Sequence, residues 1–238
     1  MKKLFTFLGL TVVVILLGTL IGLAYIGMIP GVSSFFVKQV DLGIVPDPQQ
    51  VVEINETIGH EVITSSTPAQ SEPVYEGEIE IDGSYSGQQV TSVLDSWSKN
   101  YAITPFYNVQ VKLHEDGSAE ASGMLKIAEA VALAKNLGYS DEQIEIASKY
   151  ATFVNGDLPV YVAGAVSVVN NQVSVDTSTI KMGNVTLPKY IESQVVVAVE
   201  DAVERKIRQV PTVQIQNMDL SGGQLNIAGT VPQLERAE

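Results

Sequence analysis

The pattern of hydrophobic and polar positions begins with one long apolar segment. No charged residue occurs from Leu4 to Ile29, and a helix over this segment would be roughly 39 Å long, more than the roughly 30 Å of hydrocarbon in a bilayer. Lys2 and Lys3 precede the segment, and the next basic residue is Lys38. The positive-inside rule then places the N-terminus in the cytoplasm. We therefore expect residues 1–37 to form a cytoplasmic tail and a single-pass anchor in the plasma membrane, with the rest of the chain outside.

A cleaved secretory signal peptide is the alternative for the same segment. The apolar core of a signal peptide usually spans about 7–15 residues, which is shorter than this run. No clear pair of small residues marks a cleavage site after it, and a chain without cysteine cannot carry a lipoprotein anchor. The length favours an uncleaved anchor, and both alternatives place the remaining chain outside the cytoplasm.

A polar, acidic stretch follows over residues 38–83. It contains ten acidic residues between Asp41 and Asp82 and neither Lys nor Arg from Gln39 to Ser98. Several prolines interrupt regular elements, and this composition predicts an acidic extracytoplasmic stalk. Within it, Val51–Ile54 and Glu61–Ile63 are compatible with short strands.

The pattern then changes to alternating helical and strand periodicities over residues 84–232, which predict an α+β extracytoplasmic domain. The predicted helices are Ser86–Asn100 with Ser86 as the N-cap, Ile127–Asn136, Ser140–Ala151 with a Ser140/Gln143 capping box, and Pro188–Arg208. The last helix contains the apolar run Val195–Val199, which covers more than one narrow stripe. We therefore expect a curved antiparallel sheet, built from hairpins, to wrap around this helix. Residues 233–238 are predicted to be a tail.

Three hairpins are predicted from turn residues and side-chain alternation. A three-residue loop at Glu115–Gly117 keeps the apolar residues of the first hairpin on one face. An Asn170–Asn171 turn does the same for the second hairpin, and the third crosses Ser221–Gly223 with an open register. The pairs expected in the first two hairpins are His114/Ser118, Leu113/Ala119, Val111/Ala121, Val109/Gly123, Tyr107/Leu125, Val168/Val173, Val166/Val175 and Val162/Thr179.

Charge and cysteine content narrow the function. The formal net charge is −13, and without Lys2 and Lys3 the exported part carries −13 − 2 = −15. Such a chain is poorly suited to nucleic acid, so no nucleic-acid partner is expected. The absence of cysteine excludes disulfides, thiolate ligands and a thiol nucleophile.

Candidate catalytic motifs are incomplete. Ser96–Lys99 has the Ser-x-x-Lys spacing of penicillin-recognising enzymes, but their Lys-Thr-Gly and Ser-Asp-Asn motifs are missing. Gly83–Gly87 has the outline of a nucleophile elbow with Tyr85 in place of the nucleophile. The two histidines, His60 and His114, show no metal-ligand spacing. We therefore expect no catalytic residue, no metal and no cofactor, and a protein that is not an enzyme.

The order of elements and turn residues resembles a known family. The features that carry the resemblance are Asp116-Gly117, Ser122-Gly123, the segment 159–188, a long helix, and the segment 213–232. Together they resemble the YpmS-like single-pass membrane proteins of Gram-positive bacteria and, more loosely, the LmeA-like and tubular lipid-binding (TULIP-like) domains. The resemblance implies a bent antiparallel sheet around a long helix, with an apolar groove between them.

The function expected from these features is binding of a lipid or another apolar ligand. The groove would lie between the Leu158–Met182 hairpin and the Pro188–Arg208 helix, where each buried methylene contributes about 0.8 kcal/mol. The residues expected to line it are Val160, Val162, Val166, Val168, Val173, Val175, Tyr190, Ile191, Val195, Val199 and Val203. The alternative is a structural or protein-interaction module that docks onto a partner protein of the cell envelope by a strand edge or its acidic face.

Overall fold

The computed structural model describes residues 37–64, 73–101, 103–145, 157–210 and 212–237. The apolar segment Leu4–Ile29 lies outside these residues, so the expected anchor remains a prediction. Within the described part of the chain, no helix combines the length and the apolar character needed to cross a bilayer.

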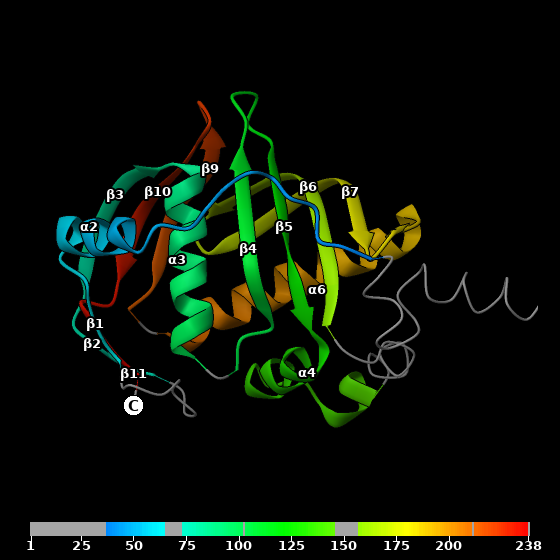
Figure 1. Ribbon diagram of the computed structural model, residues 1–238. Helices are drawn as coiled ribbons and strands as arrows, with labels where there is room; N and C mark the ends of the chain where they lie inside the picture. Colours follow the sequence, from blue (N-terminus) through cyan, green and yellow to red (C-terminus); the bar gives the residue numbers. More distant parts are fainter. Residues whose placement is uncertain (1–36, 65–72, 102, 146–156, 211, 238) are drawn as a thin grey trace, which may run out of the picture.

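The described residues form an α+β fold with curved antiparallel sheet structure, as the sequence predicts (Figure 1). An eight-stranded sheet has the order β3-β10-β9-β6-β5-β4, with β7 paired to β6 and β8 paired to β7. A second sheet has three strands in the order β1-β11-β2. The strands are β1 Glu61–Thr64, β2 Val74–Glu76, β3 Ile79–Tyr85, β4 Phe106–Leu113, β5 Ala119–Lys126, β6 Asp157–Val169, β7 Gln172–Met182, β8 Val185–Thr186, β9 Gln214–Ser221, β10 Gln224–Val231 and β11 Leu234–Ala237.

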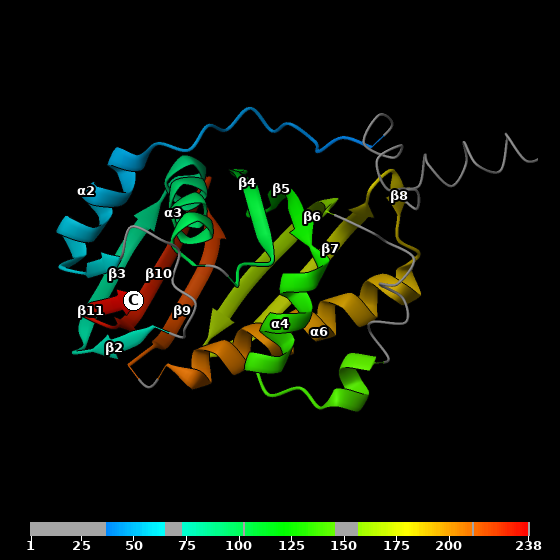
Figure 2. The same ribbon diagram turned by 60° about the horizontal axis from the view of Figure 1, so that its bottom comes forward.

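Helices lie on both sides of the large sheet (Figure 2). Helices α2 (Pro48–Ile58) and α3 (Gly87–Asn100) lie on one side, and α4 (Ile127–Asn136) and α6 (Lys189–Gln209) on the other. Helix α3 begins with the predicted cap, since the Ser86 hydroxyl accepts from Gln89 N at 3.2 Å and Ser86 N donates to Gln89 Oε1 at 2.8 Å. The Ser140/Gln143 capping box is also confirmed. The helix after it is described over 141–145, and the rest of the predicted Ser140–Ala151 helix lies outside the described residues.

Helix α6 matches the predicted long helix, with Pro188 at the N-cap rather than in the first turn. The sheet does not enclose it, which corrects the expectation of a wrapped helix. The side chains of Tyr190 and Val197 are 70% and 63% exposed, whereas Ile207 is buried. The reason is that α6 lies along the edge strand β7, where the carboxylates of Glu200 and Glu204 accept from the β7 backbone.

The first predicted hairpin, β4–β5, is confirmed next to its turn. Leu113 pairs with Ala119 and Val111 pairs with Ala121, and Gly117 has the left-handed φ of 83° that the three-residue loop requires. Farther from the turn the register shifts between Tyr107 and Gln110. Tyr107 therefore pairs with Met124 rather than with Leu125, so this part of the prediction is wrong.

The second hairpin, β6–β7, behaves in the same way. The turn is confirmed, with φ values of 51° and 64° at Asn170 and Asn171, and the expected pairs Val168/Val173 and Val166/Val175 are present. A register shift at Ala163/Gly164 then pairs Val162 with Ile180 instead of Thr179. The cause is a bulge that inserts an extra residue in β7.

The third hairpin joins β9 to β10 through Gly222 and Gly223, whose φ values are 60° and 71°. This two-residue loop pairs Ser221 with Gln224 and Leu220 with Leu225, which decides the register that the sequence left open.

The predicted stalk is corrected for its described residues, because they belong to the folded body. Strand β3 extends the large sheet by pairing with β10, and β1 pairs with β11 as the predicted short strand at Glu61–Ile63 allows. The segment Val51–Ile54 lies in helix α2 and not in a strand. The expected tail is also wrong, since β11 is the central strand of the small sheet.

Local sequence explains helix α2. Asp47 caps its N-terminus by accepting from Gln49 N at 3.0 Å, Pro48 occupies the first turn, and Gly59 ends the helix in the left-handed conformation. Val51, Ile54 and Ile58 then follow one another on a single side of the helix. This side faces the cavity described next.

Candidate functional site

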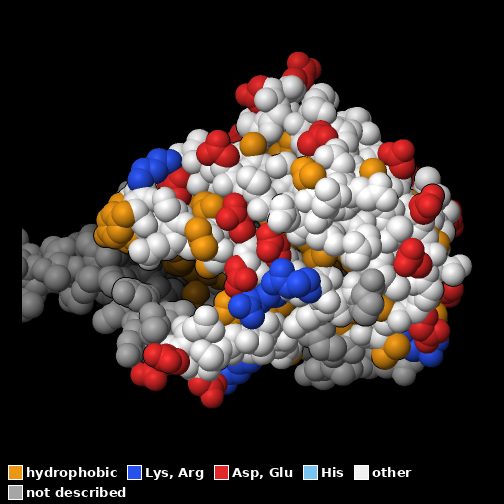
Figure 3. Space-filling model, turned by 180° about the vertical axis from the view of Figure 1, so that it is seen from behind, with side chains coloured by type: hydrophobic (Ala, Val, Ile, Leu, Met, Phe, Trp, Pro, Cys, Tyr) orange, Lys and Arg blue, Asp and Glu red, His pale blue; other side chains and the backbone are white. Residues whose placement is uncertain are grey.

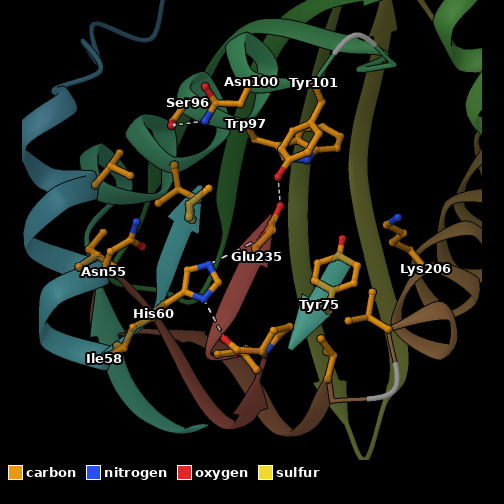
Figure 4. A pocket seen from close by; sticks show the side chains of 18 of the residues that line it. Asn55, Ile58, His60, Tyr75, Ser96, Trp97, Asn100, Tyr101, Lys206 and Glu235 are labelled. Carbon is orange, nitrogen blue, oxygen red and sulfur yellow. Dashed lines mark hydrogen bonds and ion pairs between the residues drawn. The ribbon is translucent and has the colours of Figure 1, made fainter. Parts of the chain in front are cut away.

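A cavity of about 410 Å³ lies between α2, α3, the small sheet and the C-terminal end of α6 (Figure 4). Most of the side chains that line it are apolar. The apolar and aromatic lining residues are Val51, Ile54, Ile58, Val62, Tyr75, Val93, Trp97, Tyr101, Ile207, Val210, Val213, Val231 and Pro232. The polar ones are Asn55, His60, Ser96, Asn100, Lys206 and Glu235.

Elements that are far apart in the sequence build this cavity. Helix α3 and its C-cap contribute positions spaced by three and four residues, so that Val93, Trp97 and Tyr101 lie on one side of the helix. In the small sheet, Glu235 of β11 is in register with Val62 of β1 and Tyr75 of β2. These three residues form one row, and all of them line the cavity.

Glu235 is the carboxylate of the cavity, and two side chains approach it (Figure 4). The Tyr101 hydroxyl donates a hydrogen bond to Glu235 Oε1. His60 Nε2 lies 3.8 Å from Glu235 Oε2, which is longer than a hydrogen bond. His60 Nδ1 lies 2.8 Å from the carbonyl oxygen of Pro232. Because a carbonyl can only accept, Nδ1 carries the proton, and the ring is held with Nε2 toward the carboxyl.

The surroundings of Glu235 bury its side chain and shift the pKa of its carboxyl group. Burial raises the pKa of the Glu235 carboxyl above its usual value, and the charge interaction with His60 opposes this effect. The side chains of His60 and Glu235 retain only 14% and 20% of their exposure. The arrangement can therefore hold a ligand by burying its apolar part and hydrogen bonding to its polar part.

A second apolar cavity, of about 390 Å³, lies where the chain around α4 meets α6 and the ends of β4 and β5. Leu133, Leu137, Tyr139 and Ala202 are among its lining residues. The Tyr139 hydroxyl donates to Asp201 Oδ2 at 2.6 Å, and burial and this bond raise the pKa of Tyr139 to about 12. Asp201 also pairs with Arg205 at 2.9 Å. The polar lining residues Tyr139 and Gln143 are thus bonded to residues outside the lining, Asp201 and Ser140, and the first cavity is the better candidate site.

The residues predicted to line a groove are brought together in part. The extra residue of the bulge is Ser178 in β7, so the six valines of β6 and β7 keep a common face. Val168 in this face is 2% exposed, whereas Tyr190, Val199 and Val203 on α6 are 70%, 45% and 41% exposed. The first cavity is lined by none of the eleven predicted residues, and a groove at their location remains a prediction.

Hydrogen bonds join β7 to α6. Val175 N donates to Glu200 Oε1 at 2.8 Å, and Val173 N donates to Glu204 Oε1 at 3.2 Å. Figure 3 shows the molecule from behind, with exposed hydrophobic side chains between acidic ones. Two helix carboxylates thus satisfy backbone groups at the edge of β7, a role that the charge pattern of the helix did not reveal.

The motif residues considered in the sequence are engaged elsewhere. Lys99 Nζ pairs with Asp95 at 2.6 Å, while Ser96 Oγ accepts from Asn100 Nδ2 at 3.4 Å, so each side chain of this motif has its own partner. His114 Nε2 lies 2.9 Å from Glu120 Oε1. Among the described residues, no group of three His, Cys, Asp or Glu side chains is placed to hold a metal ion.

No family model, curated protein or solved structure matches this chain. The resemblance to YpmS-like proteins and tubular lipid-binding domains therefore stays a prediction. The site itself was missed from the sequence because His60 was assigned to the stalk and Glu235 to the tail. The signal that could have found one wall was local: Asp47-Pro48 before Val51 and Gly59 after Ile58 mark the two ends of an amphipathic helix.

Proposed function

We propose that this chain is a non-enzymatic binding protein for an apolar ligand, which enters the cavity between α2, α3 and the small sheet. The observation that supports the proposal is the apolar lining of this 410 Å³ cavity, with Glu235 as a polar group in its wall. Ligand sites in proteins commonly have roughly 300–1,000 Å³ and combine apolar walls with a few polar groups. In this proposal, Leu4–Ile29 anchors the chain in the plasma membrane and the α+β domain lies outside.

The apolar contribution to binding follows from the area buried. An octyl chain has eight carbons, and at about 0.8 kcal/mol for each one its transfer from water contributes about 6 kcal/mol. Association itself costs several kcal/mol in lost motional freedom. A short alkyl chain alone therefore binds weakly, and longer chains or a polar contact increase the affinity.

Tryptophan fluorescence provides the test, because Trp97 is the single tryptophan of the chain and lines the cavity. The full chain is placed in polymer-bounded phosphatidylglycerol nanodiscs that contain no tryptophan. It is titrated with 1-bromooctane, whose bromine quenches tryptophan on contact. We expect saturable quenching of Trp97.

A pair of variants in β1 distinguishes the cavity from the membrane. Val62→Phe places a larger side chain in the cavity, whereas Ile63→Phe changes the next residue, which is 38% exposed and is not part of the cavity lining. Saturable quenching should be lost in Val62→Phe and retained in Ile63→Phe. Quenching that rises linearly with probe and is equal in both variants would refute the proposed function.

The second candidate is the structural or protein-interaction module. It is favoured by the exposed apolar side chains of α6, where Val197 is 63% exposed. Loss of probe binding in the experiment above, together with a well-folded chain, would transfer support to this candidate. A photocrosslinker at position 197 in intact membranes, compared with one at position 80 on β3, would then test whether a protein contacts α6.

A further inference from the structure

The two oxygens of the Glu235 carboxyl group are engaged to different extents. Tyr101 donates to Oε1. His60 approaches Oε2 only to 3.8 Å, which leaves Oε2 able to accept a hydrogen bond or a charge contact from a ligand. The carboxylate is also held in place, because its neighbours Tyr101 and His60 come from α3's C-cap and from the loop before β1. A positively charged group that enters the cavity thus meets a fixed partner.

Aromatic rings surround the same carboxylate. The rings of Trp97 and Tyr101 pack against each other with centroids 6.2 Å apart and an angle of 45° between their planes. Tyr75 stands beside Glu235 on the neighbouring strand, in register with it. Figure 4 shows Trp97 and Tyr101 on one side of Glu235 and Tyr75 on another. The faces of such rings attract cations, and groups of aromatic residues with a carboxylate are the usual receptors for quaternary ammonium.

The net charge of the whole chain also favours a cationic ligand. The formal net charge of −13 attracts cations and repels anions before they reach the cavity. Lys206 also lines the cavity, but it makes an interaction of its own. Figure 4 shows it on the opposite side of Glu235 from His60. An anionic head group next to Glu235 would suffer repulsion between like charges in a region of low polarity.

We propose that the ligand of this cavity is amphipathic, with an alkylammonium head group bound between Glu235 and the rings of Trp97, Tyr101 and Tyr75, and with its alkyl chain against the apolar walls. This inference rests on the proposed function and specifies its ligand class. The apolar part of the ligand would contact α2 and the end of α6, where Ile54 and Ile207 are buried. His60 acts as a positioning residue for Glu235 and does not itself need to contact the ligand.

The test uses three probes that share an octyl chain and differ in their head group: octyltrimethylammonium, 1-octanol and octyl sulfate. Each is titrated into the full chain in phosphatidylglycerol nanodiscs, whose lipids carry no ammonium group, with Trp97 fluorescence as the readout. The wild type is compared with Glu235→Gln, which keeps the size of the side chain and removes its charge. Since partition into the membrane is the same for both proteins, the ratio of their affinities reports the cavity.

We expect Glu235→Gln to weaken octyltrimethylammonium binding by about tenfold or more, because the substitution removes an attraction between opposite charges in a site of low polarity. The affinity for 1-octanol should stay within about twofold, because its chain binds the same walls. Tyr75→Leu should also weaken the ammonium probe more than the alcohol, whereas Tyr75→Phe keeps the ring and should not.

The outcomes separate the two proposals. If none of the probes binds in a saturable way, the proposed function itself fails. If all three bind and Glu235→Gln weakens them equally, or if octyl sulfate binds more tightly than the ammonium probe, the ligand class is wrong while the apolar site stands.

A second measurement covers the case in which Glu235→Gln does not fold. The affinity of the wild type for octyltrimethylammonium should rise with pH relative to that for 1-octanol, because the carboxylate must be ionised to hold the cation. The other titratable groups that line the cavity are His60, Tyr75, Tyr101 and Lys206. A ratio of affinities that does not change with pH would overturn the inference.

Discussion

Replacing Gly164 by alanine should destabilise the large sheet at the bulge of the β6–β7 hairpin. A Cβ atom at this position would lie 2.2 Å from the carbonyl oxygen of Asp176 and 2.9 Å from Thr177 Cα. Both contacts are made by backbone atoms, which cannot rotate away as a side chain can. The missing Cβ of Gly164 is what allows the two strands to approach each other at the bulge.

The size of the effect follows from the overlap. Real Cβ contacts essentially never fall below 3.0 Å, so the backbone around Asp176 must move by at least 3.0 − 2.2 = 0.8 Å. Overpacking of this kind typically costs about 1–3 kcal/mol. For a folded region of this size, about 2 kcal/mol lowers the Tm by about 4–8 °C.

Thermal unfolding by circular dichroism, with urea unfolding as a second probe, measures this change on the full chain. Gly123→Ala in the neighbouring strand β5 is the matched control, since the atom nearest to its Cβ would be Val109 Cγ2 at 3.2 Å and the nearest backbone atoms would lie at an ordinary 3.5 Å. A side chain can yield by a few tenths of an ångström, so the control should change the Tm by a smaller amount. A Gly164→Ala variant with an unchanged Tm, or one more stable than the Gly123→Ala control, would refute the argument from close backbone approach.

Three further predictions concern a helix cap, a buried acid and a surface cluster. Ser86→Ala removes the hydrogen bond to Gln89 N and should cost about 1 kcal/mol, seen as a Tm lower by about 2–4 °C; an unchanged Tm would contradict the role of the cap. Because burial raises the pKa of Glu235, the folded state holds more protons than the unfolded state between the two pKa values. As pH rises from about 4.5, the ordinary pKa of a glutamate, through the pKa of Glu235 in the folded state, the wild type should lose stability relative to Glu235→Gln. Urea unfolding across this pH range that shows no such trend would count against a buried carboxyl. Tyr139→Phe removes the hydrogen bond to Asp201, and this bond is the largest cause of the lowered pKa of Asp201. The variant should lower the free energy of unfolding by about 1 kcal/mol above pH 3.8, and by less as pH falls through the pKa of Asp201 in the folded state. A difference in urea unfolding that does not change with pH would contradict this.

The sequence determined the features that depend on neighbouring residues. The N-cap at Ser86, the capping box at Ser140, the left-handed turn residues Gly117 and Asn170, and the pairs next to these turns are all present as predicted. Such features are fixed by the conformational preferences of a few adjacent residues and by the alternation of side chains across a strand. The long helix α6 was identified for the same reason, since its pattern extends over many turns.

Tertiary structure decided the strand register beyond the bulges. It also decided that the described parts of the flanking segments belong to the folded domain. A bulge depends on a close approach between strands. Gly164 permits this approach, but a glycine within an alternating apolar pattern does not by itself predict a bulge. Likewise, an acidic composition suggests a stalk, but it does not show that β3 can pair with β10 and β1 with β11.

The candidate site belongs to this second group. His60 and Glu235 are far apart in the sequence, and only the parallel pairing of β1 with β11 places them around one cavity with Trp97. The apolar pattern of the valines reports burial on a strand face, whereas an empty volume depends on how separate elements fail to fill the space between them. That is why the sequence by itself determined the kind of fold and its turns, while the location of the cavity and of its buried carboxyl was decided by long-range pairing.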